Sequence, residues 1–307
     1  MHIADYVFGR HLKGMRKKKV CPGMLAMTLA FGMTVAGCPN GFRTEGLVFA
    51  RIDAGYEVTD FTGTDTEVVI PAIHNGLPVV SIGESAFAGS WRMPGQLTSV
   101  TIPNSVTSIG IGAFAWNQLT SITIPNNVTF IGESAFANNQ LVNITIPDSV
   151  TYIERGTFQY NQLTSVTIPN SVTYIGDGAF FNNRLTCVII PGSVTSIGWS
   201  AFDNNLLASV TIPNSVTAIG VSAFLRNQLT SVTIPDSVTY IGVWAFANNQ
   251  LTSVTIGNSV TFISSSAFAW NQLTSVTISF ADLAAADAVW GTDWRNGIPD
   301  NVWAFAP

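Results

Sequence analysis

Apolar positions return every 22 residues through most of this chain. Leucines keep that step from Leu97 through Leu119 to Leu273, and asparagines keep it from Asn117 to Asn271. A fixed period of about 20 to 50 residues is the signature of a solenoid, in which each repeat forms one coil that stacks on the next. The same step separates the phenylalanines Phe114, Phe136, Phe158, Phe180, Phe202, Phe224, Phe246 and Phe268. The pattern therefore predicts one repetitive body rather than several globular domains.

Within one coil, residues 97–118, apolar and polar side chains alternate in a way that predicts a short strand ended by Pro103. A second inward-facing stretch begins at Val106, and Phe114 returns the chain to the core. Asn117 is expected to bond turn backbone and to stack from coil to coil. The predicted inward strand positions are Leu97, Val100 and Ile102, and the outward ones are Thr98, Ser99 and Thr101.

The first unit of the repeat is preceded by two alternating runs, 47–52 and 56–61, around Asp53-Ala54-Gly55. This arrangement predicts a β-hairpin. An open solenoid end exposes both its core and a strand edge, so we expect the hairpin to cap the first coil.

At the other end, residues 279–290 read as a helix, with Ser279 and Asp282 forming a capping-box-like start and Gly291 a stop. Trp290, Trp294 and Trp303 are expected to cover the last coil. The predicted organisation is a leader (1–37), a linker and hairpin cap (38–66), the repeat solenoid (67–278) and a C-terminal cap (279–307).

The N-terminal segment has the pattern of an export signal. Four basic residues, 16–19, precede an apolar stretch, 20–36, that ends in Val-Ala-Gly-Cys at Cys38. This ending resembles the bacterial lipobox, which implies cleavage before Cys38 and lipid attachment to it. An ordinary secretion signal with an incidental cysteine is the alternative. The start could be Met1 or Met15, and the position of the basic run favours Met15.

Composition excludes several classes of function. Charged residues make up 10% of the chain and the net charge is −5, which argues against nucleic-acid binding. The three histidines lie outside the regular repeats, and the three cysteines form no evident disulfide framework. The repeats hold no histidine for a metal cluster or a nucleophile–base pair, so we expect no cofactor, no metal and no enzymatic activity.

Outward-facing positions of the repeat are where a function could be encoded. The Thr-Ser-Thr strand face hardly varies between coils, and either solubility or a repetitive partner could explain it. The positions that vary carry aromatic residues, which are enriched at binding hot spots but can also cover neighbouring coils. The candidate binding residues are Phe130, Tyr152, Tyr174, Tyr240, Phe262, Trp116, Tyr160, Trp199, Trp244 and Trp270.

The repeat LxxVxIPxxVxxIGxxAFxxNx, which runs from Val68 to Ile278, resembles the BspA-like, or treponemal, class of bacterial leucine-rich repeats. The resemblance implies a β-rich leucine-rich-repeat solenoid that is right-handed and curved, with a parallel sheet on one face. Two departures are the 22-residue coil, where 23 is more usual, and Gly257, which replaces the proline.

Members of that class are typically surface or secreted proteins implicated in adhesion. The resemblance therefore implies a non-catalytic cell-surface interaction protein whose partners are extracellular-matrix or other cell-surface macromolecules, protein or polysaccharide. The lipobox-like segment adds export to the cell envelope, as an outer-membrane surface lipoprotein anchored at Cys38. The alternative is a structural or antigenic coat protein without a dedicated ligand.

Overall fold

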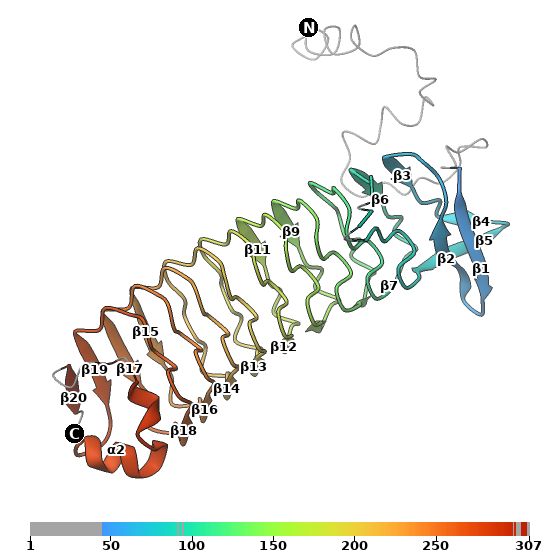
Figure 1. Cartoon of the computed structure of the whole chain (residues 1–307). Coiled ribbons are helices and arrows are strands. Elements are labelled where there is room, and N and C mark those ends of the chain that lie inside the picture. The colour runs from blue at the N-terminus through green and yellow to red at the C-terminus, as the bar shows by residue number, and fades with distance from the viewer. Residues whose placement is uncertain (1–44, 91, 94, 297, 299–301, 306–307) are drawn as a thin grey trace, which may run out of the picture. The chain divides into compact units, whose positions relative to one another are not determined.

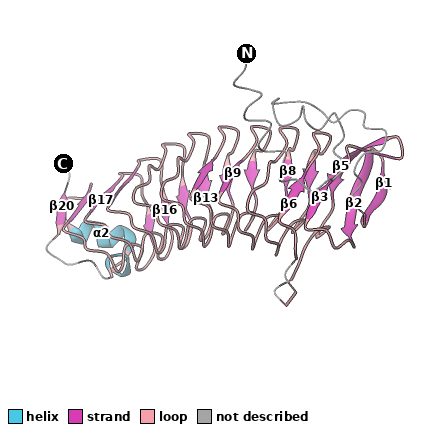
Figure 2. Cartoon of the chain, turned by 90° about the horizontal axis from the view of Figure 1, so that it is seen from above, coloured by secondary structure: helices cyan, strands magenta, loops and turns pink. Residues whose placement is uncertain are grey.

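The repeats fold as coils of a β-solenoid that stack side by side (Figures 1 and 2). The computed structural model describes residues 45–90, 92–93, 95–296, 298 and 302–305, all of which belong to one compact unit, Arg43–Pro307. The predicted leader and Cys38 lie outside the described residues. We number the regular coils 1 to 9 by their first residues, Leu97, Leu119, Leu141, Leu163, Leu185, Leu207, Leu229, Leu251 and Leu273. A column is the set of residues at the same place in successive coils.

Parallel strands run along two sides of the solenoid. The resemblance, in contrast, implies a parallel sheet on one face. The first ladder is the predicted Thr-Ser-Thr strand, and its backbone pairs join coil to coil, as in Ser231–Ser253–Ser275. Its strands are β3 (Glu67–Val69), β6 (Ser99–Thr101), β9 (Asn143–Thr145), β11 (Ser165–Thr167), β15 (Ser231–Ile234), β17 (Ser253–Ile256), β19 (Ser275–Ile278) and β20 (Trp303–Phe305).

The second ladder follows the proline turn and lies along the opposite edge in Figure 1. Each of its regular strands is two residues long, with an outward first residue and a buried isoleucine. Its strands are β5 (Leu77–Ile82), β7 (Ser108–Ile109), β8 (Phe130–Ile131), β10 (Tyr152–Ile153), β12 (Tyr174–Ile175), β13 (Ser196–Ile197), β14 (Ala218–Ile219), β16 (Tyr240–Ile241) and β18 (Phe262–Ile263).

The periodic phenylalanines form one stacked column in the interior. From Phe87 to Phe268, neighbouring ring centroids lie 5.1–5.7 Å apart and their planes differ by 1–12°. The predicted inward positions of coil 1, Leu97, Val100 and Ile102, are buried in the same core. Because each ring packs on the rings of both neighbouring coils, no coil can bury its apolar face alone.

The asparagine column confirms the predicted turn bonding. In coil 2, Asn139 Nδ2 donates to Phe114 O of the preceding coil (2.9 Å) and to Phe136 O of its own (3.2 Å). Its Oδ1 accepts from Leu119 N at 3.1 Å. One buried amide therefore satisfies donors and acceptors of two coils, and this pattern repeats through Asn271.

The N-terminal hairpin forms as predicted. β1 (Leu47–Ile52) and β2 (Gly55–Phe61) pair antiparallel, and β2 continues the second ladder by pairing parallel with β5. Phe61 lies 5.6 Å from Phe87, so it covers the first ring of the column. The short β4 (Ile73–His74) pairs with β5.

The C-terminal helix α2 (Leu283–Trp290) starts later than predicted. Its N-cap is Asp282, whose carboxylate accepts from Ala285 N, so the capping box at Ser279 is wrong. A 3-10 turn, η2 (Asp293–Arg295), follows. Trp294 is fully buried, and Trp290 Nε1 donates to Val260 O at 2.9 Å, so the predicted tryptophan cover of the last coil is present.

Candidate functional site

The ten candidate aromatic residues do not form one patch, because they fall into two groups at different places in the coil. Phe130, Tyr152, Tyr174, Tyr240 and Phe262 are the first residues of strands β8, β10, β12, β16 and β18, and we call them the tyrosine column. The other five lie in the turns that lead from the second ladder to the next coil, and we call that side the turn edge. Its aromatic members are Trp116, Tyr160, Trp199, Trp244 and Trp270.

The tyrosine column is divided into two clusters. Ser196 and Ala218 occupy the same column in β13 and β14, so they separate Phe130, Tyr152 and Tyr174 from the pair Tyr240 and Phe262.

In that pair, Tyr240 and Phe262 stack face to face at 5.7 Å with planes 3° apart. Stacking covers the facing ring surfaces and leaves edges to meet a partner. The pKa of Tyr174 is raised by burial and by Asp177 and Glu154, so its phenol keeps a proton to donate.

The turn-edge aromatics have unusual backbone conformations. Trp116 (φ 60°), Tyr160 (54°), Trp244 (55°) and Trp270 (55°) are all left-handed. Bulky side chains rarely adopt this region, whereas Asn and Gly do so at lower cost. In the other coils the two columns concerned hold small or amide residues in most cases, such as Asn138 and Ser134.

Side chains of the turn edge are nevertheless well exposed. Trp199 and Trp270 are 63% and 65% exposed, and Trp116 is 37% exposed. Tyr160 meets Phe181 edge-on, with centroids 5.1 Å apart and planes at 82°. These positions present aromatic surface directly to solvent.

Asp203 is a buried acidic residue on the turn edge, and the sequence analysis did not identify it as a candidate. The Asp203 carboxylate is buried and lies 3.9 Å from the Arg226 guanidinium. Burial raises the pKa of Asp203 to about 6, although Arg226 opposes the shift. The phenylalanine column alone locates this position in the sequence, because Asp203 directly follows Phe202.

The Thr-Ser-Thr face is exposed and regular, as predicted, with local exceptions. Cys187 is an exposed free thiol on that face, and Ile189 beside it is 83% exposed.

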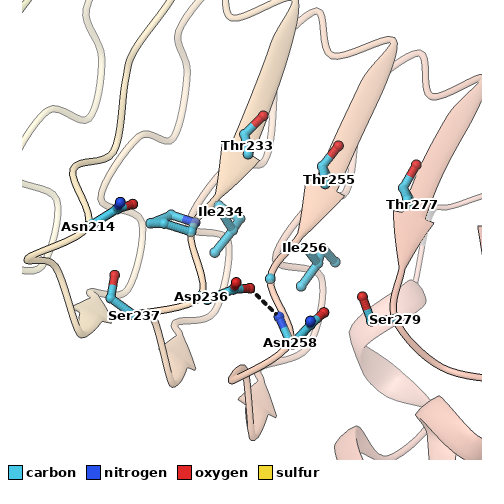
Figure 3. A pocket seen from close by; sticks show the side chains of 12 residues that line it. Asn214, Thr233, Ile234, Asp236, Ser237, Thr255, Ile256, Asn258, Thr277 and Ser279 are labelled. Atoms are coloured by element: carbon cyan, nitrogen blue, oxygen red, sulfur yellow. Dashed lines mark hydrogen bonds between the residues drawn. The ribbon is translucent and has the colours of Figure 1, made fainter. Parts of the chain in front are cut away.

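A shallow groove of about 600 Å³ lies where the first ladder turns toward the second in coils 6 to 9 (Figure 3). Gly257 stands there in place of proline, and Asp236 Oδ1 accepts from Asn258 N at 2.8 Å. The Ser237 hydroxyl is buried without a partner in the described structure, whereas Ser215 one coil earlier donates to Val194 O. The sequence analysis did not predict this groove, and Gly257 in place of proline is the signal that could have located it. Its lining includes Asn214, Thr233, Asp236, Ser237, Thr255, Asn258, Thr277 and Ser279.

Among the described residues, no group of three or more His, Cys, Asp and Glu side chains could hold a metal ion. Within the same part of the chain, no helix has the length and apolar character needed to span a bilayer.

Comparison with solved structures gives leucine-rich repeat proteins. A leucine rich cell surface protein from Faecalibacterium prausnitzii is 25% identical, with a TM-score of 0.46, over 86% of this chain and 94% of that one. A leucine-rich repeat protein from Eubacterium ventriosum is 24% identical, with a TM-score of 0.47, over 73% and 72%. One from Bacteroides ovatus is 21% identical, with a TM-score of 0.39, over 86% and 99%. No curated protein matches the chain.

The family model described as the BspA type leucine rich repeat region matches in six copies, over residues 80–208 and 195–283. These ranges cover more than half of the chain and coincide with the coils of the solenoid. A solenoid of this kind is typically a non-catalytic scaffold for protein interaction, and no catalytic family is indicated. The chain belongs to the BspA-type leucine-rich repeat family.

Proposed function

We propose that this chain is a cell-surface adhesion protein that binds extracellular-matrix or other cell-surface macromolecules without catalysis. The observation that carries the proposal is the placement of exposed aromatic rings on a scaffold whose outward strand positions are mostly Thr and Ser, with exceptions such as Val142 and Ile189. Phe130, Tyr152 and Phe262 are 45–55% exposed although they stand on regular strands. Aromatic residues give large contact area at low entropic cost and dominate many binding interfaces.

The buried core also supports a role in binding, because a coil is equally well packed with or without an exposed aromatic residue. Coil 5 carries Ser196 in the tyrosine column, yet its core residues Val194, Ile197 and Phe202 are as buried as their counterparts in coil 3. The exposed aromatics are therefore additions to a fold that is complete without them, which favours a role in recognition.

The binding test uses the purified protein on immobilised matrix proteins and on whole cells. Saturable binding is expected, and replacing Tyr152 and Phe262 by serine should weaken it about tenfold or more. Serine is a suitable replacement because Ser108 and Ser196 occupy the same column. A coat or antigenic protein without a ligand would give no saturable signal, and that result would contradict the proposal.

We further propose that the protein is exported and held at the outer surface of the cell envelope by a lipid on Cys38. The basic run, the apolar stretch and the small residues before Cys38 support this anchor. Cys38→Ser is expected to release the protein from the membrane fraction and to abolish metabolic lipid labelling. Cys187→Ser is the matched control, since that thiol lies on the exposed strand face. Labelling that persists in Cys38→Ser would refute the anchor.

A further inference from the structure

One column of the turn edge alternates aromatic rings with amides over its first four coils; its later members are Asn204, Arg226, Asn248 and Trp270. Coils 1 to 4 carry Trp116, Asn138, Tyr160 and Asn182 at the same place. Their backbones are fixed in register, because Trp116 N donates to Ala137 O and Asn138 N to Gln159 O, at 2.9 and 3.0 Å. Neighbouring coils are about 4.8 Å apart, so a ring recurs about every 10 Å along this column.

The rings are not needed for folding. The core phenylalanines beneath Trp116 and Tyr160 are fully buried, but so are Phe136 and Phe180 in the coils that carry Asn138 and Asn182. The core is therefore equally well covered with an amide at this place.

The rings also carry a conformational cost. Each of the first four members of the column has a φ between 54° and 60°, a region that asparagine tolerates better than tryptophan or tyrosine. Strained backbone conformations persist where the surrounding structure holds them, and they cluster at active sites, ligand clamps and switch regions.

The rings of this column differ from the pair Tyr240 and Phe262 in how far other rings cover their faces. Among the described residues, no ring is stacked on Trp116, and Tyr160 meets only the perpendicular ring of Phe181. Faces not covered by a parallel ring can accept a flat apolar ligand surface. In the tyrosine column, by contrast, Tyr240 and Phe262 cover one another's facing surfaces.

We infer that the column Trp116–Asn138–Tyr160–Asn182 binds an extended β-1,4-linked polysaccharide. In such a chain, successive sugars are turned over relative to one another, so the same face recurs at every second sugar. One sugar then lies over each coil, and every second sugar stacks its C–H face on an aromatic ring. The hydroxyls of the sugars between them meet the amides of Asn138 and Asn182. Asn182 Oδ1 also accepts from Asn204 Nδ2, so Asn182 offers the sugar its amide N–H donors.

A neutral ligand suits these side chains, since none of the four carries a charge. The surface of a folded globular protein has no regular period of this kind, whereas a polysaccharide repeats by its covalent structure. This inference rests on the proposed adhesion function and specifies its ligand at one edge of the scaffold.

The experiment measures retention of the full chain on insoluble chitin and cellulose, with insoluble amylose, an α-1,4 glucan, as the geometric control. Retention on at least one β-1,4 polymer is expected, and it should exceed retention on amylose. The double variant W116N/Y160N should bind the retained polymer at least about tenfold more weakly. Asparagine is compatible with the left-handed backbone, so this variant should keep its fold, which circular dichroism and thermal melting verify.

Two further variants sharpen the test. Asn138→Gly keeps the backbone conformation and removes the amide, and it should weaken retention without changing the fold. Cys187→Ser alters the exposed strand face, outside both aromatic groups, and should leave glycan retention unchanged.

The glycan inference is overturned if no β-1,4 polymer retains the chain, or if W116N/Y160N binds as well as the wild type. Saturable binding to matrix protein without glycan retention would overturn this inference and leave the proposed adhesion function standing. Absence of binding to both cells and matrix protein, with glycan retention intact, would overturn adhesion and leave the glycan site.

Discussion

The buried phenylalanine column and the turn-edge column follow opposite rules although both contribute one residue per coil. Coils 1 to 8 each place the same ring in the interior, and all eight phenylalanines from Phe114 to Phe268 are at most 1% exposed. The turn-edge column changes from Trp116 to Asn138 to Tyr160 within three coils. An interior side chain contacts its equivalents in both neighbouring coils, so a change there disturbs three coils at once. Departures from the period on the outside are tolerated by the fold and therefore carry information about function.

The largest expected effect comes from breaking the interior column. Phe180→Ala removes a ring that stacks on Phe158 at 5.6 Å and on Phe202 at 5.4 Å, and it leaves a cavity in the middle of the stack. We expect the free energy of unfolding to fall by about 3–5 kcal/mol. Chemical denaturation monitored by circular dichroism measures this loss.

The location of the damage is also predictable. Since coils contact only their neighbours, hydrogen exchange should speed up around coils 3 to 5 before it does so at either end. Uniform acceleration along the whole solenoid would contradict the nearest-neighbour description.

The asparagine column gives the next largest effect and a close control. Asn183→Ala leaves Leu163 N and the carbonyls of Phe158 and Phe180 without the side chain that bonds them. We expect a loss of about 2–3 kcal/mol in the free energy of unfolding, since buried groups lose their partners. Its neighbour Asn182 belongs to the turn edge, so Asn182→Gly should cost little. Equal losses in the two variants would contradict the expectation that the inner asparagine stabilises the fold more than the outer one.

Asp203 places a charge at the boundary between the two environments. Its pKa of about 6 in the folded protein lies above the ordinary value of 3.8, so the folded state binds the proton more tightly than the unfolded chain. The stability gained by protonation is fully present below pH 3.8 and is lost as the pH rises through 6. Asp203→Asn should therefore be more stable than the wild type at pH 7, on the order of 1–2 kcal/mol, after allowance for solvent and Arg226.

The measurement for Asp203 is thermal melting of both proteins from pH 4 to pH 7.5. The difference in melting temperature should grow as the pH rises, and it should shrink toward zero at pH 4. A difference that does not depend on pH would assign the effect to packing rather than to titration.

The smallest effect is expected on the outside and has the opposite sign. Trp270 is 65% exposed at a φ of 55°, in the column where coil 7 carries Asn248. Trp270→Asn should leave the free energy of unfolding unchanged or raise it by up to about 1 kcal/mol, because strain is relieved. Denaturation under the conditions used for Phe180→Ala makes the two variants comparable. A loss of more than about 1 kcal/mol would show that this ring supports the core.

The 22-residue period of the sequence was sufficient to predict which side chains form the buried core. The 22-residue step, the inward positions of coil 1 and the bonding of Asn117 all follow from which residues repeat, because packing between equivalent coils demands repetition. The hairpin was also predictable, since the alternation of 47–52 and 56–61 matches β1 and β2. Local chemistry was enough in these cases.

Features that depend on three-dimensional placement were not predictable in the same way. Ser279 and Asp282 are both good N-cap residues, and only the path of the chain after β19 selects Asp282. The sequence shows that the five residues of the tyrosine column share one offset in the repeat. Only the structure places the other five candidates in the turns that lead to the next coil. The left-handed conformation of Trp116 and Tyr160 has no sequence signal of its own, although asparagine in neighbouring coils marks those places.

Every regular coil begins with a leucine and adds the same rise along the solenoid, so whole coils are interchangeable units of fixed length. Loss of residues 185–206 would join coil 4 to coil 6 with every core ring still meeting an equivalent ring. It would also bring the cluster around Tyr152 about 4.8 Å nearer to the pair at Tyr240. Duplication or deletion of whole units can therefore retune the distance between two recognition elements in discrete increments, while the interior stays intact.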